Sequence, residues 1–542
     1  MHGMMMDRPI RTTDILTYAE DMHGDAEVIS ATVEGGIHRE TYREMAARCR
    51  KLAKALQALG IGLGDRVATL AWNGYRHMEL YYGVPGIGAI CHTMNPRLSA
   101  EQMIYITNHA EDKAMFLDLT FVPLVEKLAA QFPDMAYVIM TDAAHMPENT
   151  LSNVHCYEDL LAAQSDDFDW PEFDENTAAG LCYTSGTTGN PKGVLYSHRS
   201  QVLHGLMTGI SLQNAMRVGQ RLLPVVPLFH ANAWGMAHSA PLTGTSLVMP
   251  GPHLDGASVF DLMESENVFC AAGVPTVWLG LMAEISKRGR TPEGFKEVIV
   301  GGSAAPKSMI QGFEDMGVSV CHAWGMTEMS PIGTLGYLSP DLKELPAAEQ
   351  IALKATQGRR AFLVDLKIVD ESGARLPHDG KSTGELFVRG PFIMSGYFNN
   401  EQASADAMDA EGWFGTGDVA QISPQGFLTI TDRAKDLIKS GGEWISSIDV
   451  ENMAMAHDHI ANCAVIAVPH PKWDERPVLI AVAACDGPDV DSIRAHLAEH
   501  LAKWQLPDDI VFVADLPLTA TGKVSKLTLR VAYADHILPD AP

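Results

Sequence analysis

A chain of 542 residues is too long for one ordinary hydrophobic core, so two or more domains are expected. Hydrophobic residues make up 46% of the chain, which is typical of a globular protein and excludes a largely disordered one. The 40 Lys and Arg against 67 Asp and Glu give a net charge of −27, which argues against nucleic acid or an anionic membrane as the main partner.

The cysteines and the N-terminus argue against two further classes. No C-x-x-C pair occurs, and most of the 8 cysteines sit in apolar runs, so we expect reduced core residues rather than a disulfide framework or a zinc site. The N-terminal "MHGMMMDRPIRTTD" lacks the apolar centre of a signal peptide, and no apolar run approaches the ~20 residues of a transmembrane helix. A cytoplasmic protein without an integral membrane segment is expected.

Helix and strand patterns alternate along the first part of the chain. Residues 41–60 have helical spacing and stop at Gly60, and "DRVATLAW" at 65–72 reads as a strand. Residues 77–92 and 100–119 each read as a helix followed by a strand. Further on, "TSLVMP", "ENVFCAAGVP" and "FKEVIVGGSAAP" are short strands that end in Gly or Pro turns. This alternation predicts an α/β fold with parallel-rich sheets, in which ligands gather at the carboxyl ends of strands.

One loop in this region is rich in hydroxyl side chains and glycines. It lies in "YTSGTTGNPKGVLYSHRS" at 183–200, between an apolar strand and a segment that resumes apolar spacing. A flexible linker is the simple alternative, but buried elements on both sides favour a tight loop. Backbone N–H groups in such a loop bind anions, and Lys192 adds a positive charge. The loop does not have Walker spacing, because Pro191 occupies the place of the second glycine.

The pattern changes from about residue 375. "STGELFVRGP" and "GFLTITDR" are glycine-bounded strands that predict a β-rich subdomain. Beyond "DRAKDLIKSGGEW" lies a compact α/β unit of about a hundred residues, a suitable size for a small domain. We therefore expect two domains, at 1–432 and 433–542.

Six motifs in a fixed order carry a family resemblance. After the hydroxyl loop come "PLFHANAW", "HAWGMTE", "GWFGTGD", "DRAKDLIKSGGEWIS" and "LTATGKVSK". Together they resemble the adenylate-forming superfamily of acyl-CoA synthetases, luciferases and peptide-synthetase adenylation domains, along essentially the whole chain. "VGGSAAP", "LIKSGGEWISS" and "PHPKWDERP" are most similar to medium- and long-chain fatty-acid–CoA ligases and their bacterial relatives that act on 3-methylmercaptopropionate.

The resemblance implies an ATP-dependent reaction in two steps. A carboxylate attacks the α-phosphorus of ATP and expels pyrophosphate, and the thiol of coenzyme A then attacks the acyl-adenylate. The resemblance also implies Mg²⁺, a small C-terminal domain that rotates between the steps, and a homodimer. An adenylation enzyme that serves a carrier protein is the main alternative, although few residues follow Lys523. A luciferase-like oxygenase and a non-catalytic binding relative are the others.

The resemblance implies a nucleotide site built from several of these motifs. Lys192 would close the loop around the β- and γ-phosphates, and Thr327 would touch the α-phosphate. Trp324 stands where the family usually has tyrosine, and its flat ring can still stack on adenine. Asp418 would bridge the two ribose hydroxyls, with Arg433 as a further donor. The expected ATP- and AMP-binding residues are Thr184, Ser185, Gly186, Thr187, Thr188, Gly189, Lys192, Gly302, Ser303, His322, Ala323, Trp324, Gly325, Met326, Thr327, Asp418 and Arg433.

The resemblance also implies a metal site and the reactive groups. A hard cation prefers carboxylate and hydroxyl oxygens, so Glu328 and Thr184 are the expected Mg²⁺ ligands. His230 would lie by the substrate carboxylate, and Lys523 would neutralise charge between that carboxylate and the α-phosphate. Lys435 stands at the hinge position of the family. The expected catalytic residues are Lys523, Lys435, Lys439, His230 and Glu328.

The resemblance also implies the residues of the acyl and CoA sites. Trp234 would gate the acyl tunnel, and the loop after the hinge would meet the pantetheine of CoA. The segments expected to line the acyl pocket contain no Asp or Glu, so an apolar acid without an ammonium group is expected. The expected acyl- and CoA-binding residues are Trp234, Gly301, Lys439, Gly441, Gly442, Glu443 and Trp444.

Each of these residues also has an ordinary structural interpretation. Trp324 and His230 could be buried core residues, and Lys523 a solvated lysine. Thr327 and Glu328 are also common at helix N-caps, and the T-G-D that contains Asp418 could be a surface turn. The sequence leaves these alternatives open, as it leaves the length of the acid.

Overall fold

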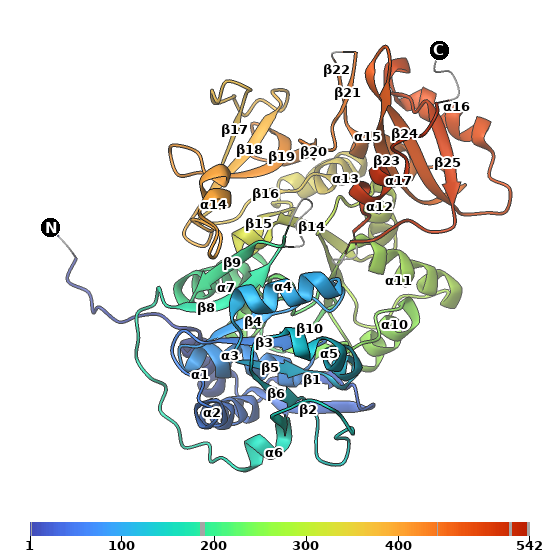
Figure 1. Ribbon diagram of the computed structural model, residues 1–542. Coiled ribbons are helices and arrows are strands. Elements are labelled where there is room, and N and C mark those ends of the chain that lie inside the picture. The colour runs from blue at the N-terminus through green and yellow to red at the C-terminus, as the bar shows by residue number, and fades with distance from the viewer. Residues whose placement is uncertain (2, 185–189, 442, 520–522, 539–542) are drawn as a thin grey trace.

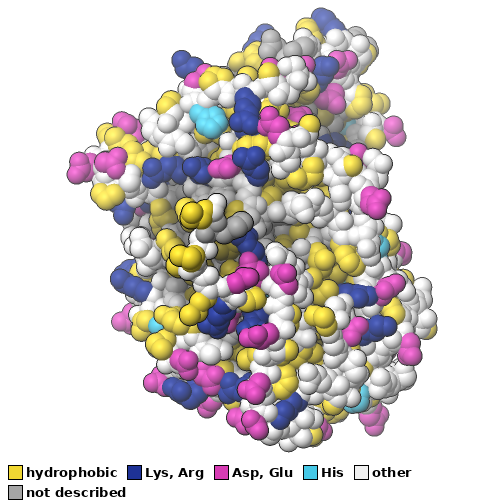
Figure 2. All heavy atoms as spheres, turned by 90° about the vertical axis from the view of Figure 1, so that its left-hand side faces the viewer, with side chains coloured by type: hydrophobic (Ala, Val, Ile, Leu, Met, Phe, Trp, Pro, Cys, Tyr) yellow, Lys and Arg dark blue, Asp and Glu magenta, His cyan; other side chains and the backbone are white. Residues whose placement is uncertain are grey.

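The computed structural model of the chain describes residues 1, 3–184, 190–441, 443–519 and 523–538, and it contains four β-sheets with helices packed around them (Figure 1). Among these residues no helix combines the length and the apolar character needed to cross a membrane. All eight cysteines are free, seven of them buried, as the sequence predicts. Figure 2 shows acidic and basic side chains interspersed over one face, with hydrophobic side chains in small groups.

The first sheet has seven strands in the order β7-β6-β5-β3-β4-β8-β9. Its strands are parallel except β9, which is antiparallel to β8. Helices α4 and α5 cover one face, and α2, α3 and α6 cover the other. The strands are β3 Arg66–Leu70, β4 Ile90–Thr93, β5 Ala114–Leu117, β6 Ala136–Ile139, β7 Val154–Cys156, β8 Ala178–Tyr183 and β9 Gly193–Ser197. The helices are α2 Tyr42–Ala58, α3 Tyr75–Gly86, α4 Ala100–Ala110, α5 Val122–Leu128 and α6 Tyr157–Ala162.

The second sheet has nine strands in the order β16-β15-β14-β13-β12-β10-β11-β1-β2, with a parallel centre and antiparallel edges. Helices α10, α11 and α12 pack on one face, while α1, α7 and α9 lie between this sheet and the first. The strands are β1 Glu27–Ala31, β2 Ile37–Thr41, β10 Arg221–Pro224, β11 Ser246–Met249, β12 Cys270–Gly273, β13 Glu297–Val300, β14 Ser319–Gly325, β15 Ile332–Leu335 and β16 Arg359–Arg360. The helices are α1 Thr12–His23, α7 His198–Ser211, α8 Ala231–Trp234, α9 Met236–Thr243, α10 Gly256–Ser265, α11 Pro275–Arg288, α12 Lys307–Asp315 and α13 Ala347–Ala355.

The β-rich part and the C-terminal unit each have a sheet of their own. A four-stranded antiparallel sheet has the order β17-β18-β19-β20, and a five-stranded sheet centres on the long pair β23 and β24. Helices α15 and α16 pack on one face of the latter sheet, and α17 packs on the other. The elements are β17 Asp365–Val369, β18 Gly384–Arg389, α14 Glu401–Ala407, β19 Phe414–Ile422, β20 Leu428–Arg433, β21 Ile438–Ser440, β22 Glu443–Ile445, α15 Ser447–Ala454, β23 Ile460–His470, β24 Asp474–Ala483, α16 Val490–His500, β25 Asp509–Val513 and α17 Lys526–Ala532.

The predicted α/β class with parallel-rich sheets, a β-rich subdomain and a separate C-terminal α/β unit is confirmed. Alternating apolar strands and amphipathic helices determine this class, because each parallel strand needs a crossover helix that covers the sheet.

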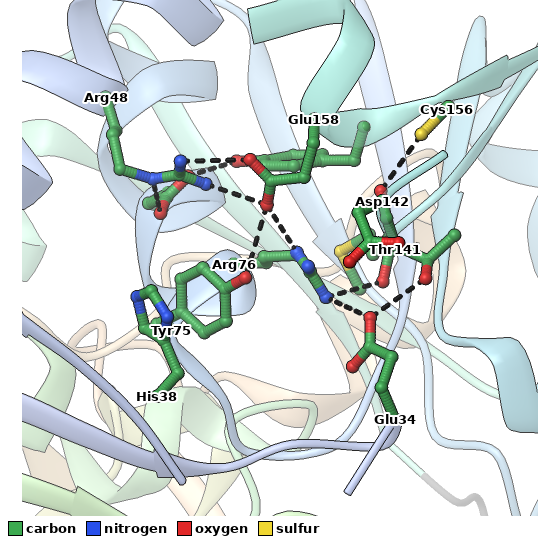
Figure 3. A network of polar contacts seen from close by, with 12 residues as sticks. Glu34, His38, Arg48, Tyr75, Arg76, Thr141, Asp142, Cys156 and Glu158 are labelled. Atoms are coloured by element: carbon green, nitrogen blue, oxygen red, sulfur yellow. Dashed lines mark hydrogen bonds and ion pairs between the residues drawn. The ribbon is translucent and has the colours of Figure 1, made fainter. Parts of the chain in front are cut away.

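A largely buried charge network joins α2, α3 and α6 to the segment between β1 and β2. Figure 3 shows Arg76 of α3 between Glu34 and Glu158, with ion pairs of 2.7 and 2.8 Å, and Glu158 also pairs with Arg48 of α2 at 3.0 Å. Glu40 of β2 lies beside this network and is 4% exposed. Burial raises the pKa of Glu40 to about 8, against the opposing effect of the Arg48 charge.

Candidate active site

Several of the site residues come from strands, or from turns that follow strands, in the nine-stranded and the four-stranded sheets. The 301–303 turn follows β13, residues 322–325 end β14, Asp418 lies on β19 and Arg433 ends β20. Lys523 comes from the C-terminal unit, yet its charge acts on Asp418 and on Glu328. The structure therefore brings groups together that are up to nearly three hundred residues apart in the chain, as His230 and Lys523 are.

The ends of the hydroxyl loop are held together at its base. The Thr184 N–H donates to the Lys192 carbonyl at 2.9 Å, and β8 and β9 continue the pairing outward. The Lys192 ammonium lies 4.9 Å from the centre of the Tyr397 ring. Ser185, Gly186, Thr187, Thr188 and Gly189 lie outside the described residues. The described part fits a tight loop with a cation at its end.

Glu328 lies in a short turn, Thr327–Met329, between β14 and β15. Its side chain is buried and accepts a hydrogen bond from the Tyr397 hydroxyl at 2.9 Å. Burial raises the pKa of Glu328, while the positive charges of Arg433 and Lys192 oppose the shift. Sequence reasoning missed Tyr397, which lies 69 residues away in the Gly- and Asn-rich "SGYFNN". A tyrosine beside a turn has no sequence feature that indicates a role, so only the fold identifies Tyr397 as a neighbour of Glu328.

The donor set fits a magnesium ion that is shared with a substrate. Mg²⁺ in nucleotide enzymes uses one or two carboxylates together with phosphate oxygens, rather than a cage made by protein alone. Glu328 supplies a buried carboxylate with one hydrogen-bond donor, so a lone-pair position remains for a cation. The described residues hold no group of three or more His, Cys, Asp or Glu that could bind a metal by themselves. Glu328 thus fits the expected arrangement, and Thr184 as a second ligand stays a prediction.

Trp324, Asp418 and Arg433 form a connected set. The Trp324 indole N–H donates to one carboxylate oxygen of Asp418 at 3.1 Å, and Arg433 pairs with the other at 2.7 Å. Asp418 is 2% exposed, and burial raises its pKa against the effects of Arg433, Trp324 and Lys523. The interpretation of the T-G-D as an exposed turn is wrong for Asp418, because the pairing of β19 with β20 and the approach of β14 bury it.

Two cationic or potentially cationic groups meet near the end of β13. Burial and the Arg433 charge lower the pKa of Lys523 to about 8, although the carboxylates of Asp418 and Glu328 oppose the shift. The pKa of His230 is lowered to about 4 by burial and by the charge of Lys523. A methyl group placed on Gly302 would lie 3.7 Å from Cε of Lys523, so this lysine reaches the turn after β13. The interpretation of Lys523 as a solvated lysine is wrong in this structure.

Trp234 packs against the same turn. Its side chain is 9% exposed, and a methyl group on Gly301 would lie only 2.9 Å from the far edge of its indole ring. The backbone that carries it is unusual, because Ala231, Asn232, Ala233 and Trp234 all have φ between 46° and 58°. Four consecutive non-glycine residues in the left-handed region carry strain that the surroundings must hold. The sequence gives no sign of this turn.

The remaining residues of the "HAWGMTE" motif form the wall between β13 and β15. His322 is buried and Ala323 approaches Gly301 through its carbonyl. Gly325 admits no side chain, because a methyl group there would lie 1.9 Å from the Pro331 carbonyl oxygen. The Met326 N–H donates to the same oxygen at 3.0 Å, while Ser303 is exposed.

The predicted CoA loop lies elsewhere. Lys439 and Gly441 belong to the β21–β22 hairpin, which Figure 1 shows at the far end of the C-terminal unit from β14. Lys439 lies over the ring of Trp444, which is 50% exposed. Backbone pairing holds Glu443 opposite Ser440, and Gly442 lies outside the described residues. The structure brings Lys523, and not this hairpin, to the residues predicted to bind the nucleotide.

Lys435 lies in the short connection between β20 and β21. Its carbonyl accepts a hydrogen bond from Arg530 of α17 at 3.1 Å, and Arg530 also pairs with Asp436. Burial lowers the pKa of Lys435. The predicted hinge is thus tied to the C-terminal unit.

A family model described as AMP-binding enzyme matches residues 17–398, and one described as AMP-binding enzyme C-terminal domain matches 449–523. The chain belongs to the AMP-binding enzyme family. A 3-methylmercaptopropionyl-CoA ligase of Ruegeria lacuscaerulensis is 46% identical over 99% of this chain and 100% of its own length. A medium-chain-fatty-acid–CoA ligase of Ectopseudomonas oleovorans is 47% identical over 99% of this chain and 98% of its own.

The fold of this AMP-binding enzyme is also found among solved structures. The crystal structure of an anthranilate CoA ligase in complex with anthranoyl-AMP superimposes with a TM-score of 0.87 at 22% identity, over 97% of this chain and 98% of the other. The predicted family and the prediction of an AMP-forming acid–CoA ligase are confirmed by the family and its full-length relatives.

Proposed function

We propose that this AMP-binding enzyme activates an apolar carboxylic acid of the fatty type and transfers the acyl group to coenzyme A. The acid is a medium- or long-chain fatty acid or 3-methylmercaptopropionate. Full-length relatives near 46% identity are named for 3-methylmercaptopropionate and for medium-chain fatty acids. The observation that carries the proposal is the character of the buried segments around Trp234.

Three segments surround the position expected for the acyl chain. They are residues 230–238, 270–278 and 300–306, and they contain no Asp or Glu. Most of their apolar side chains are buried, among them Ala233, Met236 and Ala272 at 0% exposure. An ammonium group buried there without a partner would cost about 3–5 kcal/mol. These surroundings support an alkyl or thioether chain and disfavour an amino acid.

The charges around Lys523 support its role in the first step. An oxygen of the acid attacks the α-phosphorus of ATP, the bond to the bridging oxygen breaks, and pyrophosphate leaves. Negative charge then gathers where Lys523 and Lys192 can neutralise it. His230 has a pKa of about 4, so at neutral pH it is uncharged and can donate a hydrogen bond to the acid without carrying a charge. A magnesium ion on Glu328, when bound, neutralises phosphate charge.

The second step needs access for the thiol of CoA. Its sulfur attacks the acyl carbonyl, and AMP leaves with the electron pair of the acyl–oxygen bond. In this structure Lys523 lies at the site, and the Lys439–Trp444 hairpin lies apart from it. This supports assigning the observed arrangement to the first step. We propose that residues 433–542 rotate relative to residues 1–432 about Lys435, so that Lys439, Gly441, Gly442, Glu443 and Trp444 replace Lys523 beside the site.

The test is a ligation screen with two readouts. Purified enzyme, ATP and Mg²⁺ are incubated with acids from three to eighteen carbons, with 3-methylmercaptopropionate and with 3-aminopropionate, and pyrophosphate and acyl-CoA are measured with and without CoA. We expect kcat/KM to rise about fourfold for each added CH₂ until the pocket ends, because each buried CH₂ contributes ~0.8 kcal/mol. A preference for amino acids over their deaminated analogues would contradict the proposed pocket. Pyrophosphate release without acyl-CoA would contradict the transfer to CoA.

Two expectations from the resemblance stay predictions. One is a homodimer, which light scattering on the purified protein tests. The other is a cytoplasmic location, which fractionation of the producing cells tests.

A further inference from the structure

The side chain of Trp324 is held at two points. Its indole N–H donates to Oδ2 of Asp418 at 3.1 Å. Its other edge lies over Gly333 of β15, where a methyl group would come within 3.0 Å of the benzene part of the ring. A glycine on one side and an acceptor on the other therefore fix the plane of the indole. The contact also links the wall of the nine-stranded sheet to the β-rich sheet that carries Asp418.

Each oxygen of the Asp418 carboxylate has one partner. Arg433, its cross-strand neighbour on β20, binds Oδ1 at 2.7 Å, and Trp324 binds Oδ2. Each carboxylate oxygen can accept two hydrogen bonds. With the Trp324 N–H donating to Oδ2 and Arg433 ion-paired with Oδ1, an acceptor position remains on each oxygen. Two neighbouring hydroxyl groups, such as those of a ribose, match two adjacent acceptors.

We propose that Trp324 is a positioning residue for Asp418, and that its indole N–H makes nucleotide binding depend on both ribose hydroxyls. The inference rests on the proposed function in one respect, since it takes Asp418 as the ribose-binding carboxylate. An indole carries its donor on the edge of the ring, whereas a phenol carries it at the tip. The tryptophan at this position therefore reaches a carboxylate beside the ring, in addition to presenting a flat face to adenine.

Without the indole donor, Oδ2 loses its only hydrogen bond from the described residues. The carboxylate is buried, so an unpartnered oxygen would either turn toward a ribose hydroxyl in a new direction or attract a proton. Both changes weaken the discrimination between ribose and deoxyribose. Loss of the donor also raises the pKa of Asp418 further, because the N–H stabilises the charged form.

The test measures equilibrium binding of AMP, 2′-deoxy-AMP and 3′-deoxy-AMP by calorimetry, without acid or CoA. The variants are Trp324→Phe, which keeps a flat ring and removes the donor, Asp418→Asn, and the double variant. Trp504→Phe is the matched control, because Trp504 is a partly exposed indole in the C-terminal unit. Trp324→Tyr is the second variant, since its donor lies at the ring tip.

We expect Trp324→Phe to weaken AMP binding roughly tenfold, the effect of losing a hydrogen bond to a charged group. The affinity ratio of AMP to at least one deoxynucleotide should fall about threefold or more. In the Asp418→Asn background the same change should have little further effect, which is the coupling expected of groups in contact. As the pH is lowered, the affinity for AMP should begin to fall at a higher pH in Trp324→Phe than in wild type. Trp504→Phe should match wild type in every one of these measurements.

Three results would overturn the inference. One is an equal loss of affinity for AMP and both deoxynucleotides, with an unchanged pH dependence, which would make Trp324 only a wall for the base. Another is full additivity of Trp324→Phe and Asp418→Asn. A third is a Trp324→Tyr protein that is folded and keeps wild-type discrimination, which decides the question if Trp324→Phe does not fold. Because no acid is present, an error in the proposed substrate leaves the test intact, whereas a wild type that binds no AMP refutes the nucleotide site itself.

Discussion

Replacing Lys523 with alanine removes the charge that reaches the turn after β13 from the C-terminal unit. The neighbours of Lys523 include His230, Asp418 and Glu328, and burial lowers its pKa to about 8. A fixed charge on a transferring phosphoryl group stabilises the transition state by ~3–4 kcal/mol. We therefore expect Lys523→Ala to slow adenylate formation roughly a hundred- to a thousandfold. Thioester formation from supplied acyl-AMP should be nearly unchanged, because the proposed rotation removes Lys523 before the thiol attacks.

The lowered pKa of Lys523 also predicts how the rate of pyrophosphate release depends on pH. Lys523 must be protonated to act, so kcat/KM for pyrophosphate release should fall as pH rises through 8. With a pKa of about 8, the protonated fraction drops from ~0.9 at pH 7 to ~0.1 at pH 9, a loss of about tenfold. In Lys523→Arg this fall between pH 7 and 9 should be much smaller, because arginine stays charged over the whole range.

Two half-reaction assays separate the effects. Pyrophosphate release is followed without CoA, and acyl-CoA formation is followed from synthetic acyl-AMP without ATP. Lys503→Ala, an exposed lysine of the same unit, is the control and should match wild type in both. Equal losses in the two half-reactions, or a wild-type profile that is flat from pH 7 to 9, would refute the reasoning.

Three further predictions concern other parts of the molecule. Lys435→Pro should leave adenylation near wild type and abolish acyl-CoA formation, since proline fixes φ near −65° at the proposed hinge. Trp234→Ala should change the preferred chain length of the acid more than the KM for ATP, because its indole fills the space against Gly301. Glu40→Gln should reduce the loss of stability at alkaline pH. The folded-state pKa of Glu40 is raised to about 8, so its contribution to stability is complete below ~4.5 and is lost as pH rises through 8, on the order of 1 kcal/mol between pH 7 and 9.

Each of these has a measurement that decides it. Normal acyl-CoA formation by Lys435→Pro would show that the hinge is elsewhere. An unchanged acid profile for Trp234→Ala would contradict the gate. For Glu40, urea unfolding at pH 7 and 9 compares the variant with wild type and with Glu371→Gln, which changes an exposed carboxylate outside this network. Parallel pH dependence of all three proteins would mean that Glu40 is not the titrating group, and Arg48, Glu79, Glu158 and His38 around it would be tested next.

The sequence alone determined the parts of this protein that depend on local chemistry. Alternating apolar strands and helices fixed the α/β class, because their periodicity is a property of neighbouring residues. The hydroxyl loop before Lys192, the "GMTE" with Glu328 and the "TGD" with Asp418 could be recognised because each is a short run of contiguous residues. Their roles came from the resemblance of the ordered motifs, and those roles stay predictions.

Only the tertiary structure decided which of these groups touch. Tyr397 meets Glu328 across 69 residues, and Trp324 meets Asp418 across 94, through the packing of separate sheets. The left-handed turn at 231–234 was equally invisible in the sequence. The approach of Lys523 to the site was expected only from the family resemblance, because no local pattern indicates it. The physical reason is that local patterns determine which element forms, whereas contacts between distant segments depend on sheet register and on how the C-terminal unit is oriented, which no short segment specifies.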